Sequence, residues 1–599
     1  MSAEPTAPEQ AAVDDFLGSP QSGWAGGARS AIDHHVAFGG FHGAEENRHL
    51  LLPALQAVQS AIGWVSPGAL NYVSERLSVP PGEAYGVASF YALLALEERP
   101  ARVAHVCEDV SCRTRGGREL LAALAGRHDV VPSPCLGQCD RSPAVLVQRA
   151  GDPDLSLWGA TPQNVIALLS GAPLIDPAPG HYGIPQTERG SKDLRLLHRV
   201  GAVDPYSLDD YCVAGGYEAL KKAIEIGPGR IIEEVKQSGI RGRGGAAFPM
   251  GVKWESVAGS GSKPLLVCNA DEAEPGTFKD RGLMEGDPFS LVESMTIAGY
   301  AIGAGRGYLY IRGEYPRAAR HVASALEVAR EARLLGENIL ESGFDFDIEI
   351  RMGGGAYICG EETALFNSIE GYRGEPRQKP PFPTEAGLFG LPTIVNNVET
   401  LVNLPLILLH GGAAYAELGT AESTGIKLFC MSGDIALPGV YEVEFGATLG
   451  ELIELAGGPI EDIAAILLGG VAGSFVGPDL MDLPLTFEDT RATGVSLGTA
   501  VIMPFGVSTD FEDLAMRIAA FFRDESCGQC VPCRVGTVRQ EEALHRIVAR
   551  APLNGRASEL ELLSEINDAM RLGSICGLGH TAGSALRSLI DLGLIGAAE

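Results

Sequence analysis

The spacing of the cysteines restricts the fold of this chain more than any other feature. Cys527, Cys530 and Cys533 recur at every third position near the end of the chain, and Cys576 follows at a distance. A C-x2-C-x2-C run places three sulfurs around a cube and is typical of [4Fe–4S] binding, with a distant fourth thiolate. Zinc rarely takes three cysteines so closely spaced, so the sequence predicts an iron–sulfur cluster held by these four residues.

A second group of cysteines lies in the first quarter of the chain. Cys107 and Cys112 are separated by four residues, and Cys135 and Cys139 by three. Zinc pairs prefer C-x2-C, whereas wider spacings suit two iron atoms that each need a pair of thiolates. The spacing therefore favours a [2Fe–2S] cluster, with a zinc site and free structural thiols as alternatives.

The N-terminal residues carry no signal for export. The segment MSAEPTAPEQAAVDDF is acidic and has no basic stretch before an apolar core. The sequence also lacks the run of about 18 uncharged apolar residues that a bilayer span requires. We therefore predict a cytoplasmic protein in a reducing compartment, where structural disulfides are rare. The cysteines outside the two groups are interpreted as small buried hydrophobic residues: Cys212, Cys268, Cys359 and Cys430.

The chain is acidic, yet one loop gathers cations among glycines. Its 46 Lys and Arg residues against 76 Asp and Glu give a net charge of −30, which disfavours nucleic-acid binding and direct membrane attachment. Such a loop suits a bound phosphate, although an ordinary turn before a helix would look the same. The segment is neither G-x-G-x-x-G nor a Walker loop. The residues concerned are Arg241, Gly242, Arg243, Gly244, Gly245 and Lys253.

Three further loops carry acids or amides. The acids can accept hydrogen bonds from ribose hydroxyls and disfavour a 2′-phosphate, or they can simply complement a helix dipole. Paired amides suit the edge of a ring with donors and acceptors. No Ser/His/Asp or Cys/His arrangement indicates a nucleophile, so no catalytic side chain is predicted. The loops hold Asp271, Glu272 and Glu274, then Glu361 and Glu362, and then Asn396 and Asn397.

Composition and periodicity divide the chain into seven stretches. An acidic tail rich in Ala, Gly and Pro precedes a segment with helical periodicity, and strand-like runs then alternate with helical ones. A connection punctuated by Pro and Gly leads to the largest α/β block, a compact α+β segment and a helical end. The expected divisions are a mobile tail (1–45), a helical region (46–100), a [2Fe–2S] domain (101–172), a linker (173–214), an α/β domain (215–420), an α+β domain (421–508) and a helical [4Fe–4S] domain (509–599).

These motifs together resemble a known family. The segment ALQAVQSAIGWVSPGALNYVSERLSVPPGEAYGVASFY, followed by the first cysteine group, resembles the small thioredoxin-like [2Fe–2S] subunit of respiratory complex I. Residues 215–599 resemble its FMN-bearing, NADH-binding subunit. The fused arrangement is similar to the diaphorase component of soluble NAD-dependent formate dehydrogenases and NAD-reducing hydrogenases. The resemblance implies a multidomain α/β fold: a helical region, a thioredoxin-like [2Fe–2S] domain, an α/β FMN/NADH domain, a β-grasp-like domain and a C-terminal helical bundle with the [4Fe–4S] cluster.

The resemblance also implies a role for each matching position. FMN would be held by Gly242, Arg243, Gly244, Lys253, Asn269, Asp271, Glu272, Tyr357, Gly360, Asn396, Asn397 and Thr400. NAD(H) would contact Gly245, Ala246, Phe248, Glu274, Glu361, Glu362, Lys379 and Phe382. The two phenylalanines would sandwich the adenine, which an aromatic face does well.

The chain departs from the family pattern at two positions. Ser256 stands where the family usually has an aromatic residue three positions after the lysine of the KW pair. Ala247 stands where a glycine is usual, in GAAF instead of GAGF. Because positive φ would cost stability at an alanine, we expect an ordinary helical φ at Ala247.

The resemblance implies an enzyme that carries electrons. NADH yields two electrons as hydride, clusters accept one at a time, and a flavin converts one mode into the other. The implied partner is the catalytic large subunit of a hetero-oligomer, with formate dehydrogenase favoured over hydrogenase. A complex I subunit is an alternative of the same chemical class. A non-catalytic iron–sulfur redox sensor or scaffold with a degenerate nucleotide pocket is an alternative of another class.

Overall fold

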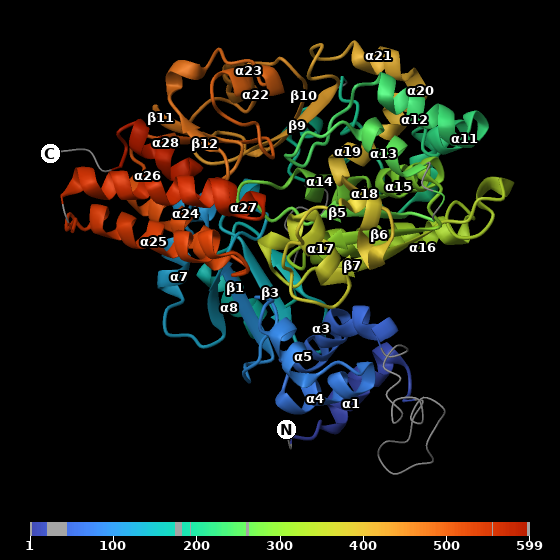
Figure 1. Ribbon diagram of the computed structural model, residues 1–599, viewed down its shortest axis with the longest axis horizontal. Helices are drawn as coiled ribbons and strands as arrows, with labels where there is room; N and C mark the ends of the chain where they lie inside the picture. The colour runs from blue at the N-terminus through green and yellow to red at the C-terminus, as the bar shows by residue number, and fades with distance from the viewer. Residues whose placement is uncertain are drawn as a thin grey trace.

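The computed structural model describes residues 3–20, 45–173, 182–191, 193–258, 261, 263–553 and 555–595. Its units follow one another along the chain and pack side by side (Figure 1). The N-terminal helices lie at one end, the strands β1 and β3 lie above them, and the C-terminal helices flank the centre. No helix within these ranges is both long and apolar enough to cross a bilayer.

The N-terminal unit is helical and includes part of the predicted tail. Its elements are α1 (Ala7–Leu17), η2 (Glu45–Leu50), α3 (Leu51–Ile62), α4 (Pro67–Leu77) and α5 (Pro81–Ala88). The prediction of a mobile tail is wrong for α1, because Val13 is fully buried and the Tyr72 hydroxyl donates to Asp14 at 2.8 Å. An alanine- and acid-rich composition is compatible with a helix once one apolar face finds a partner. Residues 21–44 of the predicted tail lie outside the described ranges.

The next unit is a four-stranded sheet with helices, in the strand order β2-β1-β3-β4. Strand β1 pairs parallel to β2 and antiparallel to β3. The strand-like and helical runs of the sequence are confirmed as β1, β3, α7 and α8. The elements are β1 (Arg102–Cys107), α6 (Val110–Thr114), α7 (Gly117–Ala123), β2 (Val130–Ser133), η3 (Cys139–Arg141), β3 (Val145–Arg149), β4 (Leu155–Leu157) and α8 (Pro162–Leu169).

The predicted linker packs against two domains where the structure describes it. It contains α9 (Pro185–Glu188) and α10 (Leu208–Val213). The side chain of Gln186 exchanges two hydrogen bonds with the backbone of Glu442. The Tyr211 hydroxyl donates to Glu293 at 2.6 Å. Around α9 and α10 the predicted linker is therefore packed against the neighbouring domains and is not a flexible connection.

The central unit holds a parallel sheet in the order β7-β6-β5-β8. Because all four strands run the same way, their carboxyl ends meet at one edge, where ligands bind in open α/β sheets. The strands are β5 (Leu265–Ala270), β6 (Arg306–Ile311), β7 (Asp347–Met352) and β8 (Thr393–Asn397). The helices are α11 (Glu218–Ile226), α12 (Pro228–Gln237), α13 (Met250–Ala258), α14 (Lys279–Gly286), α15 (Pro288–Ile302), α16 (Pro316–Glu331), η4 (Ile339–Glu341), η5 (Tyr357–Gly360), α17 (Glu362–Ile369), α18 (Pro383–Ala386), η6 (Leu388–Gly390), α19 (Val398–Val402), α20 (Leu404–His410) and α21 (Gly412–Ala416).

A mixed sheet and a group of helices complete the fold. The sheet has the order β10-β9-β13-β11-β12, and its own hydrophobic core lies under α22. Its elements are β9 (Ile426–Met431), β10 (Gly439–Glu444), α22 (Leu449–Leu455), β11 (Ile463–Leu468), β12 (Ser474–Val476), η7 (Pro478–Leu480), α23 (Phe487–Ala492) and β13 (Val501–Gly506). The C-terminal helices are α24 (Phe511–Asp524), α25 (Val531–Val548), α26 (Arg556–Gly573), α27 (Gly577–Thr581) and α28 (Ser584–Asp591).

Candidate functional site

The first cysteine group converges in the small sheet domain. All four thiols are buried, and the sulfurs of Cys135 and Cys139 lie 3.4 Å apart. The carboxylate of Asp109 caps α6 and accepts from the backbone of Cys135 at 3.1 Å, which joins the two halves of the group. Hydrogen bonds from the Cys107 and Cys139 thiols hold the pKa of Cys135 well below its usual value. Hydrogen bonds to neighbouring thiols and burial raise the pKa values of Cys107 and Cys139 well above the usual value. The four converging thiols nevertheless fit a metal cluster, which would bind them as thiolates.

The second cysteine group lines one small cavity. Cys527 and Cys530 precede α25, Cys533 lies in its first turn, and Cys576 precedes α27. Burial raises the pKa of Cys533 to about 11 and that of Cys576 to about 12. These thiols would therefore need bound positive metal to ionise at neutral pH. In the described parts of the chain, no group of three or more His, Cys, Asp or Glu side chains is placed around a single ion position.

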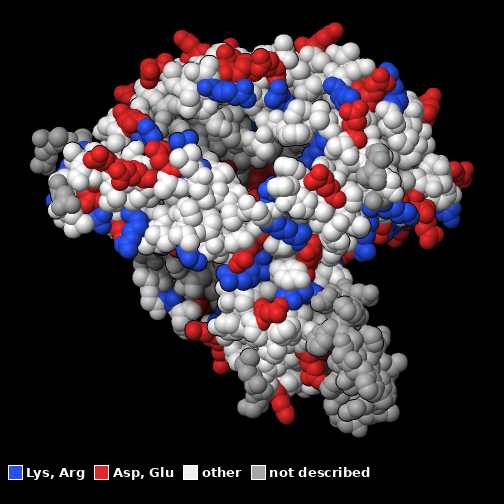
Figure 2. Space-filling view, in the orientation of Figure 1, with Lys and Arg blue, Asp and Glu red and all other residues white. Residues whose placement is uncertain are grey.

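A larger cavity of about 410 Å³ opens at the carboxyl edge of the parallel sheet. The hollow near the centre of Figure 2 has acidic atoms deep inside it. The structure brings together here these predicted positions: Gly244, Gly245, Ala246, Asn269, Asp271, Glu272, Glu274, Tyr357, Gly360, Glu361 and Asn397. The remaining predicted positions do not line it: Gly242, Arg243, Phe248, Lys253, Glu362, Lys379, Phe382, Asn396 and Thr400.

Three acids form part of the cavity wall, of which Glu272 and Glu274 are buried and Asp271 is half-buried. Burial raises the pKa of Glu272 and of Glu274 to about 7, and it raises the pKa of Asp271 well above its usual value. Oxygen Oδ2 of Asp271 is buried and has no hydrogen-bond partner among the described residues. An unpartnered buried oxygen is costly unless a ligand satisfies it. The cavity therefore fits a polar cofactor, and acids with raised pKa values repel a phosphate-bearing ligand less than fully ionised carboxylates would.

Two lysines and two glutamates lie beside the cavity. Lys379 contacts Glu361 at 3.1 Å and Glu362 at 2.7 Å, and Lys253 contacts Glu362 at 3.3 Å. Glu361 also caps α17 by accepting from the backbone of Thr363 and Ala364. Glu361 therefore stabilises the start of α17, as expected for an acid that complements a helix dipole, and it also lines the cavity. Glu362 is the acid that neutralises both lysines.

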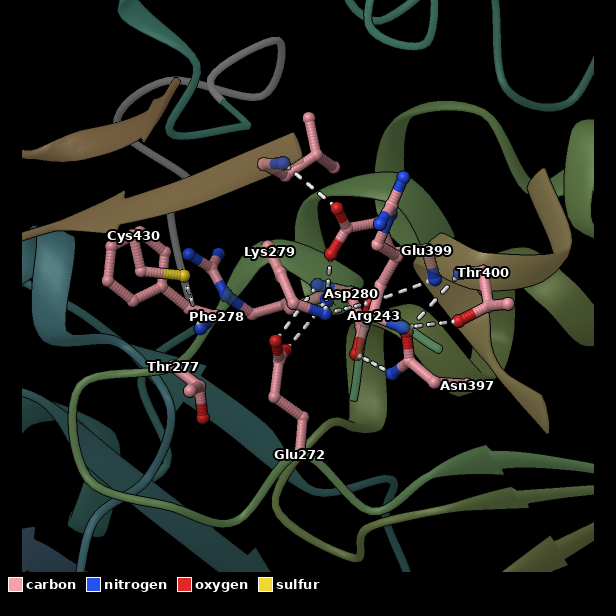
Figure 3. Close-up of polar contacts among 12 residues, drawn as sticks. Arg243, Glu272, Thr277, Phe278, Lys279, Asp280, Asn397, Glu399, Thr400 and Cys430 are labelled. Atoms are coloured by element: carbon pink, nitrogen blue, oxygen red, sulfur yellow. Dashed lines mark hydrogen bonds and ion pairs between the residues drawn. The ribbon is translucent and has the colours of Figure 1, made fainter. Parts of the chain in front are cut away.

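A buried network of charges begins at the cavity wall and is drawn in Figure 3. The ammonium of Lys279 contacts Asp280 at 2.8 Å and Glu399 at 3.2 Å. Asn397 donates to Asp280 at 2.6 Å, which orients the amide beside the cavity. Lys427 of β9 contacts Glu399 at 2.6 Å, so the network ties the two large sheets together. Lys279 and Asp280 also line the cavity. They lie in the same sequence segment as Asp271, Glu272 and Glu274, but the sequence assigned them no role.

The guanidinium of Arg243 does not face the cavity. The side chain is 1% exposed, and its Nη2 donates to the carbonyl of Thr424 at 2.8 Å. The backbone N–H of Arg243, and not its side chain, contacts another position predicted to bind FMN: it donates to the Thr400 hydroxyl at 2.8 Å (Figure 3). The guanidinium of Arg243 was predicted to lie near a phosphate, but it instead joins two domains through its hydrogen bond to Thr424.

The φ predicted for Ala247 is wrong. The angle is +51°, in the left-handed region. The chain reverses here, because Arg241 pairs with Pro249 and the N–H of Gly242 donates to the carbonyl of Phe248 at 2.9 Å. This narrow reversal requires a left-handed backbone conformation at position 247, whichever residue stands there. For an alanine that conformation costs about 1–2 kcal/mol.

Other side chains also differ from expectation or remain predictions. Cys212 is exposed, so its interpretation as a buried hydrophobic residue is wrong, whereas Cys268, Cys359 and Cys430 are buried as predicted. It lies on α10, whose outer side faces solvent. The rings of Phe248 and Phe382 are each 54% exposed, and their stacking on adenine stays a prediction.

The β-grasp-like sheet contributes a wall that the sequence did not predict. Its loops line the cavity with Gly469, Ala472, Ser496, Gly498 and Thr499. Glu274 accepts from the backbone of Ala472 at 2.9 Å and from the Thr499 hydroxyl at 3.1 Å. These residues are about 200 positions from Glu274, and only the packing of the two domains brings them to the site.

Four family models match the chain. The Nuo51 FMN-binding domain matches residues 235–406, and the thioredoxin-like [2Fe–2S] ferredoxin matches 40–170. The iron–sulfur binding region of NADH-ubiquinone oxidoreductase-F matches 513–592, and the SLBB domain matches 428–471. These matches confirm the predicted FMN, [2Fe–2S] and [4Fe–4S] cofactors and the multidomain fold.

Individual proteins match over long stretches. The HndC subunit of the NADP-reducing hydrogenase of Solidesulfovibrio fructosivorans is 43% identical over 68% of this chain and 83% of its own length. The F 2 subunit of the NADH-quinone oxidoreductase of Rhizobium meliloti is 45% identical over 66% and 94%. A crystal structure of an NAD+-reducing [NiFe]-hydrogenase in the H2-reduced state superposes with a TM-score of 0.77, at 32% identity over 91% of each chain.

Proposed function

The chain belongs to the family of flavin- and iron–sulfur-dependent NADH dehydrogenase subunits of complex I and NAD-reducing hydrogenases, and from that membership we propose how its own residues serve the reaction. It is an NADH-oxidising diaphorase subunit, and its relatives are subunits of larger assemblies. We propose that the cavity holds FMN with the nicotinamide against it, and that the [4Fe–4S] cluster exchanges electrons with a partner subunit. Bound FMN supplies the conversion between hydride transfer and single-electron transfer.

One observation carries this proposal: the larger cavity shares a wall with the small cavity lined by the second cysteine group. Ile358 and Leu578 line both of them. Leu578 lies two residues after Cys576, and Ile358 lies in η5 beside Tyr357. A cofactor in the larger cavity would therefore be separated from the thiols by single side chains. The backbone amides of Gly244 and Gly245 and the acids of the wall orient it, and the walls from both domains exclude water.

The experiment is direct. Purified protein should show flavin absorbance and reduce ferricyanide with NADH. Protein that lacks flavin and this activity after reconstitution with FMN would overturn the proposal. That result would favour the alternative function, a non-catalytic iron–sulfur scaffold or redox sensor.

For the partner, we propose the catalytic subunit of a larger hetero-oligomer, and a formate-oxidising subunit is the type expected from the sequence. The hydrogenase alternative is supported by the superposition over 91% of both chains with an NAD+-reducing hydrogenase, which includes the N-terminal units. The complex that co-purifies with this chain distinguishes the two. Reduction of NAD+ by formate and not by H2 supports the formate partner, and the converse result overturns it.

Replacing Glu362 with glutamine should relax discrimination against NADPH. The substitution removes the carboxylate shared by Lys253 and Lys379. A 2′-phosphate would then meet Lys253 without its carboxylate partner and Lys379 paired with Glu361 alone. We expect the ratio of kcat/KM for NADPH to that for NADH to rise roughly tenfold, the value of about one charged contact. Glu255→Gln, on the exposed side of α13, is the control. An unchanged ratio would remove this role from Glu362.

Glu274 should make the KM for NADH depend on pH. Its folded pKa of about 7 lies above the usual 4.5 because of burial, so the group is neutral below pH 7 and becomes anionic above it. We expect KM to rise by up to roughly tenfold per pH unit above 7 in the wild type, because the ionised carboxylate repels the anionic pyrophosphate of NADH. Glu274→Gln should flatten this rise.

Thr499→Val tests whether Glu274 is the group whose ionisation changes KM. It removes a donor that favours the charged form of Glu274, so the rise in KM should move to higher pH. A KM profile that is the same in wild type, E274Q and T499V would exclude Glu274 as the titrating group.

A further inference from the structure

Arg312 occupies the carboxyl end of β6, directly at the edge of the parallel sheet. It is 2% exposed, and its backbone N–H points to the carbonyl of Ala270, the last residue of β5. No motif in the sequence marks this arginine. A fully buried guanidinium is retained only where its donors are matched by well-placed acceptors.

The acceptors come from two different domains. Nη1 donates to the backbone carbonyl of Glu272 at 2.6 Å, and Nη2 donates to the backbone carbonyl of Cys135 at 2.5 Å. Glu272 lines the large cavity, and Cys135 belongs to the first cysteine group. One planar group therefore contacts the loop of the flavin cavity and the loop of the [2Fe–2S] site at once.

Glu314 fixes the orientation of this guanidinium. Its carboxylate accepts from Nε at 3.1 Å and lies 3.0 Å from Nη2. Because the fork geometry of arginine is rigid, this pair aims the remaining N–H groups at the two carbonyls. A lysine at the same position would keep the positive charge but could not present donors in both directions.

A neighbouring side chain joins the same two loops independently. The Tyr315 hydroxyl donates to the carboxylate of Glu272 at 3.2 Å. The same hydroxyl lies against Gly137, where an added Cβ would approach it to 2.2 Å. Gly137 lies between Cys135 and Cys139, so the loop of the [2Fe–2S] site presses directly on the cavity loop.

We propose that Arg312 is a positioning residue that braces the [2Fe–2S] loop against the flavin-cavity loop, so that one cation sets both the cofactor affinity of the cavity and the potential of the cluster. The inference rests on the proposed function. It goes beyond it by assigning a shared determinant to two cofactor sites.

The test uses the full-length protein with three variants: R312M, R312K and, as control, R306M at the exposed start of the same strand. The measurements are the FMN dissociation constant from flavin fluorescence and the midpoint potential of the [2Fe–2S] cluster from EPR-monitored titration. For R312M we expect FMN to bind about tenfold or more weakly, because two hydrogen bonds from a charged donor are lost. The cluster potential should become more negative, because a buried positive charge near the cluster is removed.

R312K separates geometry from charge. It should keep the cluster potential near that of the wild type while FMN binds more weakly, and R306M should leave both unchanged. The proposal is wrong if R312M leaves both the FMN dissociation constant and the cluster potential unchanged, or changes only one of them. If R312M fails to fold, R312K decides, since wild-type FMN affinity in R312K also overturns it. Absence of NADH–ferricyanide activity in the wild type would instead overturn the proposed function.

Discussion

Replacing Cys533 with serine should stop electron transfer to the partner subunit while NADH still reduces ferricyanide at close to the wild-type rate. The thiol is 5% exposed and lies in the first turn of α25, among four thiols around one cavity. Its loss should reduce partner reduction by more than the ~10–100-fold that losing an outer-shell partner of a metal costs. Ferricyanide accepts electrons from the flavin site, whose cavity keeps all its lining residues.

The measurements are the EPR signal of the reduced [4Fe–4S] cluster and the rates with both acceptors. Cys212→Ser is the control, because Cys212 is exposed and lies outside both groups. A variant that keeps the signal and the rate of partner reduction would show that Cys533 is no ligand. Equal loss of both activities would mean that the cluster is required for flavin binding as well.

Replacing Gly244 with valine should empty the flavin site while both clusters remain. A Cβ at Gly244 would lie 3.1 Å from Cβ of Asn397, at the wall of the large cavity. Valine adds two further carbon atoms, and overpacking of about 1–3 kcal/mol corresponds to roughly five- to 150-fold weaker FMN binding. NADH–ferricyanide activity should fall in proportion to the flavin content.

Flavin content per chain, cluster absorbance and activity are measured on the same preparation. Gly229→Val is the matched control, because a Cβ at Gly229 has no atom within 4 Å. Wild-type flavin content in G244V would exclude this wall from the FMN site. Loss of the clusters as well would indicate a general folding defect and not a local one.

Local patterns predicted the elements that short-range chemistry governs. The cysteine intervals identified both thiol groups because a cluster needs its ligands on tight loops. The acids that follow β5 and the paired amides at the end of β8 reached one edge of the sheet because parallel strands end together.

Residues that serve the site through long-range packing carried no such signal. Arg243 was interpreted as a phosphate cation, yet its guanidinium is buried against Thr424. Thr499 and Arg312 looked like ordinary residues, and each gains its role from a partner in another domain. Ala247 adopts positive φ because of the reversal around it, and the preference of alanine does not override that geometry.

The spacing of the cysteines by itself predicted the two iron–sulfur clusters, because ligand spacing is a local property. FMN and NAD(H) followed from the family resemblance, since loop composition alone left a phosphate site and an ordinary turn both open. Only the tertiary structure decided which side chains meet. It placed the β-grasp loops and Lys279 in the cavity wall, α1 on the N-terminal helices, and Arg312 between two cofactor loops. The physical reason is that burial and charge pairing depend on contacts between segments tens to hundreds of residues apart, which no local pattern encodes.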